Sequence, residues 1–312
     1  MKNFDIFGRK FFLILISAVG IYSIFLFLSD INLIVEKFSN FDLKVIPIIM
    51  LAIFSSWLVL FVRWTLLLKN HQISIPLKDS LLIYLAGFTF ALSPLKSGEF
   101  FKSILLKRKF DVKRTISVPI IFLERFFDII GTFVIAIFSI IFLGIDFLPA
   151  IFIVLIGIFF MFLVIYSKSS FNRLVKILFK FKYLEKFAVS LENSHDVMKK
   201  SFTSKMVSCS LGLTIFYRLV EAIGIYFVLL GFGIDVLSYL SLATTYSASV
   251  ILGTISMSPG GIGITEASLA GMMSIQGIEI STALALAIVI RFFTLWFSII
   301  IGIISLKMSK AY

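Results

Sequence analysis

The chain has 312 residues, of which 60% are hydrophobic, and its mean hydropathy is +1.08. This composition excludes a soluble globular protein and indicates one integral membrane domain over residues 1–312. The net charge is +12, but the basic residues follow the expected membrane topology and do not lie along one soluble face. Nucleic acid is therefore not an expected partner.

Six apolar segments are long enough to cross a membrane, because a spanning helix needs ~20 apolar residues. They are residues 11–28, 45–66, 116–144, 148–166, 206–230 and 282–306. Basic residues precede the first segment, as they do in a signal peptide. No small-residue cleavage site follows it, so we expect a first spanning helix.

Two further apolar segments, 80–106 and 238–275, are interrupted by related motifs. The first contains SPLKSGE at residues 93–99, and the second contains SPGGIGITE at residues 258–266. In each motif a glycine follows the proline by four residues, and a glutamate comes soon after. Irregular backbone at membrane depth must be buried in protein or line a cavity. We therefore predict two re-entrant helical hairpins, with shallow full spans as the alternative.

The distribution of Lys and Arg orients the predicted helices. If the N-terminus is cytoplasmic, the inner segments are the N-terminus, 67–115, 167–205 and the C-terminal tail, and they hold 23 of the 29 Lys and Arg. We expect both termini to be cytoplasmic. The hairpins would then enter from opposite sides, so that residues 1–145 and 146–312 form an inverted repeat around a site near the midplane.

The predicted cytoplasmic loop at 167–205 alternates apolar and basic residues. A basic amphipathic helix on the inner leaflet and an ordinary positively charged loop both account for this pattern.

Nine ionisable residues lie in or beside the predicted membrane segments. A charge at the centre of a spanning helix costs about 2.5–3.5 kcal/mol, so such residues usually pair and face an interior. Helical spacing predicts the pairs Arg125 with Asp128 and Arg218 with Glu221, which structural salt bridges would also explain. The nine residues are Arg63, Glu99, Glu124, Arg125, Asp128, Arg218, Glu221, Glu266 and Arg291.

Arg63 and Arg291 have no acidic residue three or four positions away. Their partners are therefore expected on another helix, on a hairpin or on a ligand. Arginine suits phosphate, because its planar group donates two parallel hydrogen bonds and stays charged when buried. Arg63 lies near the end of its span and has the alternative of extending to the cytoplasmic interface.

The glycines of the second motif suggest a backbone site. Gly260, Gly261 and Gly263 permit conformations closed to other residues and close approach by a ligand. A half-helix beginning near Ile264 would direct free N–H groups into the membrane interior, where they would form an anion site. Glu266 in its first turn would cap this helix, pair with an arginine or take up a proton during transport.

Taken together, the two motifs, Glu124-Arg125-x-x-Asp128 and a late intramembrane arginine resemble a known family. They are similar to the flippase-like membrane region of lysylphosphatidylglycerol synthases and to its stand-alone relatives in bacteria and archaea. The resemblance covers nearly the whole chain and implies a multi-pass protein of a prokaryotic plasma membrane that moves lipid between leaflets. The matching positions are Pro94, Gly98, Glu99, Glu124, Arg125, Asp128, Ser258, Pro259, Gly260, Gly261, Gly263, Glu266 and Arg291.

We therefore expect an all-α polytopic lipid translocase with six spans and two hairpins, and not an enzyme. The expected cargo is an anionic or aminoacylated phospholipid, or a polyprenyl-phosphate-linked lipid. Its headgroup would lie between the hairpins, held by Arg125, Arg291 and the half-helix N-terminus. The predicted substrate-binding residues are Arg63, Glu99, Glu124, Arg125, Asp128, Arg218, Glu221, Ser258, Pro259, Gly260, Gly261, Gly263, Glu266 and Arg291.

Two alternatives belong to other functional classes. One is a membrane-embedded lipid-modifying enzyme that uses Glu99 or Glu266 as a general base. The other is a non-catalytic scaffold for a separate synthase or glycosyltransferase. The synthases carry a soluble aminoacyl-transferase domain after the membrane region, and this sequence ends at Tyr312, so lysyl transfer by this chain alone is not expected. No residues have metal-ligand or nucleotide-loop spacing, so no metal or cofactor is expected.

Overall fold

A computed structural model describes residues 41–144 and 195–310, together with Gly20, Ser39 and parts of 152–179. These residues form helices and no strand. Four helical segments are long and apolar enough to cross a membrane, namely Leu43–Asn70, Arg114–Leu143, Ser204–Gly231 and Ile280–Ser309. They confirm the predicted spans 45–66, 116–144, 206–230 and 282–306. The predicted span 11–28 and much of 148–166 lie outside the described residues.

The four spans are built from helices joined by short turns. Their elements are η1 (Leu43–Val45), α3 (Ile46–Asn70), α6 (Arg114–Ile137), α7 (Ile140–Leu143), α12 (Ser204–Gly231), α15 (Ile280–Arg291), η6 (Phe292–Trp296) and α16 (Phe297–Ser309). Element η6 is a π-helical turn. Two further helices, α9 (Lys168–Phe179) and α11 (His195–Ser201), belong to the predicted cytoplasmic loop.

Local sequence signals set where these helices begin. Pro47 lies in the first turn of α3, where its missing N–H is not needed. Thr203 caps α12, because its hydroxyl accepts a hydrogen bond from the N–H of Met206 at 3.3 Å.

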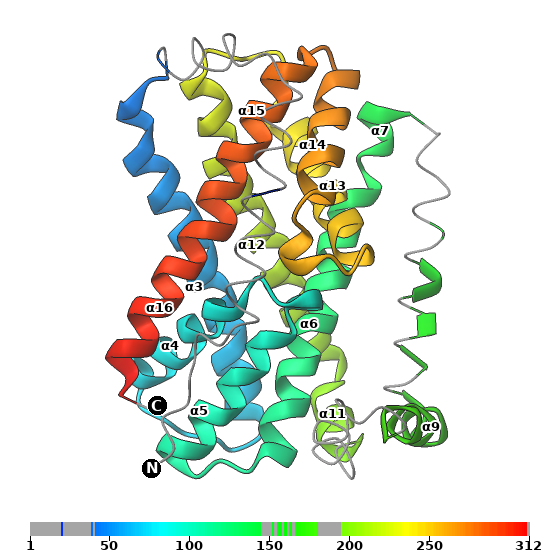
Figure 1. The fold of residues 1–312 in the computed structure, drawn as a ribbon. Coiled ribbons are helices and arrows are strands. Elements are labelled where there is room, and N and C mark those ends of the chain that lie inside the picture. Colours follow the sequence, from blue (N-terminus) through cyan, green and yellow to red (C-terminus); the bar gives the residue numbers. More distant parts are fainter. Residues whose placement is uncertain are drawn as a thin grey trace.

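Both interrupted segments fold as helix, irregular turn and helix. The first consists of α4 (Leu77–Ala86), η2 (Gly87–Phe90), η3 (Pro94–Phe100) and α5 (Phe101–Phe110). The second consists of α13 (Tyr239–Ile255), η5 (Pro259–Gly261) and α14 (Ile264–Ile275). In both, an extended serine, Ser93 or Ser258, precedes the proline that starts a 3₁₀ turn. The two segments enter the helix bundle from opposite ends, and their turns lie near its middle (Figure 1).

The turns of the two interrupted segments pack against each other and against the last span. A buried apolar cluster contains Ala91 and Leu92 from the first segment, Ile262 from the second, and Leu295 and Ile299. The last span also fits closely on the first segment. Gly302 of α16 has no room for a side chain, because the backbone of Thr89 in η2 lies against it.

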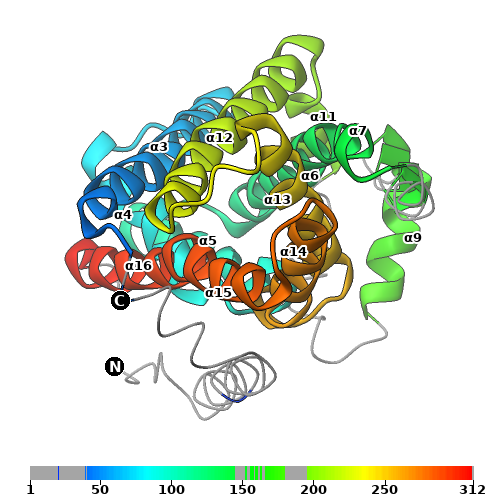
Figure 2. The same ribbon diagram turned by 90° about the horizontal axis from the view of Figure 1, so that it is seen from above.

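The long helices of the four spans surround the turns of the two interrupted segments. Helices α3 and α12 pack along each other, and α6 packs on both α12 and α13. Seen from above, α15 and α16 lie on the opposite side of the bundle from α3 and α12 (Figure 2). The interrupted segments therefore meet inside a frame of long helices.

Candidate functional site

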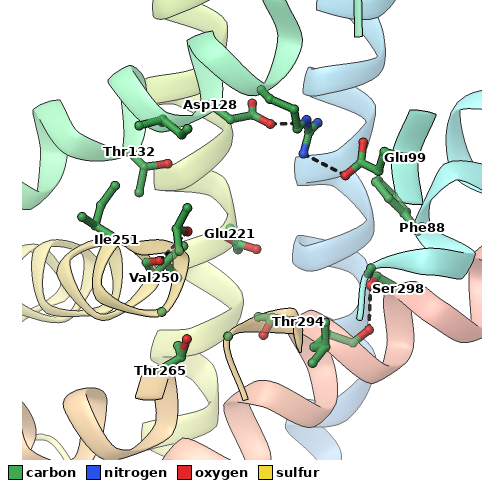
Figure 3. Close-up of a pocket in the computed structure, with 18 of the residues that line it drawn as sticks. Phe88, Glu99, Asp128, Thr132, Glu221, Val250, Ile251, Thr265, Thr294 and Ser298 are labelled. Carbon is green, nitrogen blue, oxygen red and sulfur yellow. Dashed lines mark hydrogen bonds and ion pairs between the residues drawn. The ribbon is translucent and has the colours of Figure 1, made fainter. Parts of the chain in front are cut away.

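A cavity of about 580 Å³ lies where the two interrupted segments meet α6, α12 and the last span. Figure 3 shows Glu99, Asp128 and Thr132 of the first half on its wall, with Glu221, Thr265, Thr294 and Ser298 from the second half. The wall is polar around these side chains and apolar elsewhere, with Trp57, Phe88 and Ile251 among its residues. A site with this mixture can hold a polar group next to an apolar one.

The cavity wall contains nine of the fourteen residues predicted to bind substrate. They are Glu99, Arg125, Asp128, Arg218, Glu221, Ser258, Gly260, Gly261 and Arg291. The other five do not line it, and they are Arg63, Glu124, Pro259, Gly263 and Glu266. Two of these five contact a wall residue directly, because Arg63 binds Asp128 and Glu266 binds Arg291. Glu124 is linked to the wall residue Glu99 through Lys102, which binds both carboxylates.

Arg125 of α6 lies between two carboxylates. Its Nη1 is 2.8 Å from Oε1 of Glu99, and its Nη2 is 2.8 Å from Oδ2 of Asp128. The predicted pair between Arg125 and Asp128 is therefore present. In Figure 3, one dashed line runs from Asp128 and one from Glu99 to the guanidinium group of Arg125 between them.

Arg63 of α3 finds its partner on another helix. Its Nη1 is 2.7 Å from Oδ1 of Asp128 and donates a hydrogen bond to the hydroxyl of Thr214 at 2.6 Å. The side chain is fully buried. The alternative in which Arg63 extends to the cytoplasmic interface is therefore wrong. Asp128 and Thr214, on two other helices, hold the guanidinium group of Arg63 inside the bundle. Helix α3 itself offers no acidic partner three or four residues away.

Lys102 of α5 is a member of this network that the sequence analysis missed. Its Nζ is 2.7 Å from Oε2 of Glu124 and 3.3 Å from Oε2 of Glu99. The ammonium also lies 4.7 Å from the ring centroid of Trp64. The distribution of basic residues assigns Lys102 to the inner segment 67–115 and gives it no part in the site. Its position three residues after Glu99 is the signal that indicates pairing instead.

Arg218 of α12 forms the second predicted pair. Its Nη1 is 2.5 Å from Oε2 of Glu221, and its Nε donates to the hydroxyl of Thr132 at 2.9 Å. The hydroxyl of Tyr217 donates to the other oxygen of Glu221 at 3.1 Å. The carboxylate of Glu221 is therefore held from both sides at the cavity wall.

Glu266 of α14 both pairs and caps. Its Oε1 is 2.9 Å from Nε of Arg291, and its Oε2 accepts a hydrogen bond from the N–H of Gly263 at 2.7 Å. Arg291 also donates to the carbonyl of Gly260. Of the alternatives for Glu266, the structure shows arginine pairing and helix capping together.

Two N–H groups of the glycine turn before this half-helix have partners within the chain. Helix α14 begins at Ile264, as expected, and Gly261 and Gly263 have φ angles of 73° and 87°, which favour glycine. However, the N–H of Gly261 donates to the carbonyl of Ser258, and that of Gly263 donates to Glu266. These two N–H groups are already bonded within the segment, so they are not free to receive an anion.

One ion pair occurs in both halves. In each, a glutamate after the Ser-Pro turn binds an arginine of the next span, 26 residues later for Glu99 and Arg125 and 25 for Glu266 and Arg291. The halves differ three residues beyond the arginine, where the first has Asp128 and the second has Thr294. The first half therefore carries an extra carboxylate at the cavity.

Within the described ranges, no group of three or more His, Cys, Asp and Glu side chains could hold a metal ion. The chemistry visible at the site is therefore that of guanidinium groups, carboxylates, hydroxyls and backbone carbonyls.

The sequence matches known proteins along most of its length. Over 225 residues, it is 27% identical to the UPF0104 membrane protein MJ1078 of Methanocaldococcus jannaschii, covering 69% of this chain and 90% of that protein. Residues 14–302 match the family described as "Lysylphosphatidylglycerol synthase TM region". This match includes the four candidate spans except the last residues of the fourth, both interrupted segments and the cavity. The chain therefore belongs to the lysylphosphatidylglycerol synthase TM region family.

Proposed function

We propose that this protein is a lipid translocase that accepts a phosphate-containing headgroup in the cavity and moves it between leaflets. The observation that carries this proposal is a cavity of about 580 Å³ with charged walls at the meeting point of two interrupted helical segments. Its volume falls in the range of about 300–1,000 Å³ typical of small-molecule sites. Interrupted, Gly- and Pro-containing segments in corresponding positions of two halves are typical of transporter binding sites.

The two arginines that follow the Ser-Pro turns are the proposed headgroup ligands. Arg125 and Arg291 both line the cavity, one from each half. A guanidinium group offers two parallel donors to a phosphate. The acyl or prenyl chain would stay in the bilayer while the headgroup crosses, so the cavity needs to hold only the polar end.

The proposed cargo is an anionic or aminoacylated phospholipid, or a polyprenyl-phosphate-linked lipid. All three carry a phosphate group that Arg125 and Arg291 could bind. The name of the family supports an aminoacylated phospholipid among them, and a separate synthase or glycosyltransferase is the proposed source of the cargo.

The proposed mechanism is alternating access by an inverted repeat. The segments α4–α5 and α13–α14 would be re-entrant hairpins of halves 1–145 and 146–312, within a protein of six spans. Their entry from opposite ends and the glutamate–arginine pair of each half support this arrangement (Figure 1). The tips pack together through Leu92 and Gly260, so a shift of one hairpin against the other would change which end of the cavity is closed.

The enzyme alternative gains no support at Glu266. A general base needs a carboxylate oxygen within reach of the substrate. Glu266 is fully buried behind the wall, and its two oxygens bind Arg291 and the N–H of Gly263. This arrangement gives Glu266 a structural part.

Leaflet exchange in vesicles tests the translocase. The full chain, reconstituted into vesicles with trace fluorescent phosphatidylglycerol, should let an impermeant quencher remove more than the outer-leaflet half of the signal. Protein-free vesicles should lose about the outer half only. Fluorescent aminoacyl-phosphatidylglycerol and polyprenyl phosphate provide the other two cargo classes. Exchange at the protein-free level for all three would contradict the proposal, and a new lipid species in the extract would indicate the enzyme instead.

The proposed orientation places the basic end of the bundle in the cytoplasm of a prokaryotic cell. Exposed Lys and Arg residues lie at the end of α5, the start of α6 and the end of α16, and Lys44 lies just before α3. Figure 1 shows the start of α3 at the opposite end of the bundle from the end of α16. Cytoplasmic segments carry an excess of such residues. Both termini would then be cytoplasmic, and the protein would be a multi-pass component of the plasma membrane.

Cysteine labelling tests this orientation. In a Cys209→Ser background, an impermeant maleimide added to intact cells should label Val236→Cys, between α12 and α13, and should not label Lys78→Cys on α4. Both native side chains are exposed, and the α12–α13 connection lies at the opposite end of the bundle from the start of α4 (Figure 1). Permeabilised cells should show labelling at both positions. The opposite pattern in intact cells would reverse the orientation, and labelling of both positions there would contradict the arrangement of the two segments.

A further inference from the structure

In the part of the chain that the structure describes, the positive and negative groups in and behind the cavity wall are equal in number. The wall carries three guanidinium groups and three carboxylates, from Arg125, Arg218, Arg291, Glu99, Asp128 and Glu221. Two cations and two carboxylates lie behind it and pair with each other or with wall residues, and they are Arg63, Lys102, Glu124 and Glu266. The formal charge of this network is therefore zero before a headgroup enters.

A phosphodiester headgroup would disturb this balance. Both Nη atoms of Arg125 already contact carboxylates, Glu99 and Asp128, at 2.8 Å each. A phosphate that binds Arg125 through two parallel hydrogen bonds takes the places of these oxygens. The displaced carboxylates then face a further anion in a buried site, where uncompensated charge is costly. Binding of the anion therefore requires a compensating positive charge.

We propose that this charge is a proton, which Asp128 takes up as the anionic headgroup binds. A hydronium ion in the water on the side where the headgroup enters gives up the proton, so one O–H bond breaks there and one forms on the carboxylate, and no electron is transferred. The proton leaves when the headgroup leaves, so anionic lipid and proton move together without net charge. This inference rests on the proposed function and adds its coupling ion.

The position of Asp128 makes it the carboxylate that takes the proton. Its side chain is 15% exposed, against 2% for Glu99 and 3% for Glu221. The corresponding residue of the second half is Thr294, so the repeated glutamate–arginine pair forms there without this carboxylate. A protonated Asp128 could keep its contact with Arg63 through one oxygen and donate its O–H to the phosphate.

Charged and titratable groups on the neighbouring elements interact with Asp128 directly or through one another. They are Arg63 on α3, Tyr84 on α4, Glu99 on η3, Lys102 on α5, Glu124 and Arg125 on α6, Tyr217, Arg218 and Glu221 on α12, and Tyr246 on α13. Helix α11 also packs on α6, and its described residues contribute nothing to the wall. While the cavity is empty, Arg63 and Arg125 lie in ion-pair contact with Asp128, and nearby positive charge favours the ionised form of a carboxyl group. A phosphate bound to Arg125 would replace the attraction between Arg125 and Asp128 by repulsion between the phosphate and Asp128. This repulsion favours the protonated form of Asp128.

Proton uptake on binding tests the inference without any transport measurement. The purified full chain in detergent is titrated with dihexanoylphosphatidylglycerol, a phosphodiester whose single charge does not titrate near neutral pH. In weakly buffered solution, a pH-indicator dye should report about one proton taken up per lipid bound. Linkage then requires the affinity to fall about tenfold per pH unit between about pH 6 and 8. The zwitterionic dihexanoylphosphatidylcholine should take up none.

Two variants separate Asp128 from other titratable groups. Asp128→Asn keeps the size of the side chain and an acceptor for Arg63, but it cannot ionise. Its binding of dihexanoylphosphatidylglycerol should take up no proton and should not depend on pH. Asp79→Asn is the matched control, because Asp79 pairs with Lys109 at 2.6 Å on α4 and does not line the cavity. It should keep the wild-type uptake and pH dependence.

The possible results distinguish the translocase function from proton uptake by Asp128. Binding by the wild-type protein without proton uptake, or unchanged uptake in Asp128→Asn, overturns the assignment, as does binding that needs sodium ions. If leaflet exchange persists in any of these cases, the translocase function stands without the proton. If the protein neither binds nor exchanges the lipid, both proposals are wrong for this cargo class. Even if Asp128→Asn does not fold, the wild-type measurement decides whether a proton accompanies the headgroup, and its absence overturns the assignment.

Discussion

Arg291→Ala should reduce leaflet exchange to the level of protein-free vesicles. Arg291 presents its guanidinium to the cavity, while Glu266 and the carbonyl of Gly260 fix its position from behind. A hydrogen bond to a charged group contributes about 1.5–3 kcal/mol, so losing one such contact should weaken headgroup affinity roughly 10- to 100-fold. Exchange of labelled phosphatidylglycerol and binding of its short-chain form measure the two effects separately.

The control for Arg291→Ala must account for the charge left behind. Glu266 is fully buried, and removing its arginine alone would also destabilise α14. The double variant Arg291→Ala/Glu266→Gln restores neutrality and should recover much of the thermal stability, but it should remain inactive. Arg291→Lys should recover activity only partly, because an ammonium group does not offer the planar pair of donors. Wild-type exchange in a folded Arg291→Ala protein would rule out the proposed role of this arginine.

Lys102→Met should lower the free energy of unfolding by about 3–5 kcal/mol, the usual cost of breaking a buried ion pair. Lys102 is completely buried and lies between the carboxylates of Glu99 and Glu124. Methionine keeps an apolar stem of similar length beside Trp64, so the change removes the charge more than the packing. Thermal or denaturant unfolding in detergent provides the measurement.

The same helix offers a matched control for Lys102→Met. Lys107 also lies on α5 and pairs with Asp111 at 2.5 Å, but both side chains are largely solvent-exposed. Lys107→Met should therefore change the free energy of unfolding by about 1 kcal/mol or less. Lys102→Met/Glu124→Gln should recover part of the stability, because it removes one of the two stranded carboxylates. Equal effects of the two single lysine substitutions would show that Lys102 does not hold a buried network.

Much of the helical framework follows from local sequence. The lengths of apolar segments predict the four spans, since a helix of this length satisfies its backbone internally whatever its neighbours are. The Ser-Pro turns predict the breaks at Ser93 and Ser258 for the same local reason, because a proline cannot continue the hydrogen-bond ladder of the preceding helix. The π-helical turn at Phe292–Trp296 has no such marker, since neither glycine nor proline occurs in it.

The charged site follows from local sequence only where partners share a helix. Arg125 with Asp128, and Arg218 with Glu221, could be predicted because helical geometry brings residues three apart together. Arg63 binds Asp128 only because α3 packs near α6, and no spacing rule contains that information. Thr214 could not be predicted for another reason, since a search for charged residues passes over neutral hydroxyl groups that accept hydrogen bonds from an arginine.

The ion pairs described above share a property that bears on how such a protein could change shape. Each of them joins two residues of the same half, as Arg125 with Glu99 and Arg291 with Glu266 illustrate. The arginine contacts that cross between halves, from Arg63 to Thr214 and from Arg218 to Thr132, end on neutral hydroxyls. Rocking of one half against the other as rigid bodies would leave these pairs together and would exchange apolar contacts and hydrogen bonds whose acceptors are neutral. The electrostatic barrier to such a motion would be low, because no opposite charges among these pairs are pulled apart in the low dielectric of the membrane.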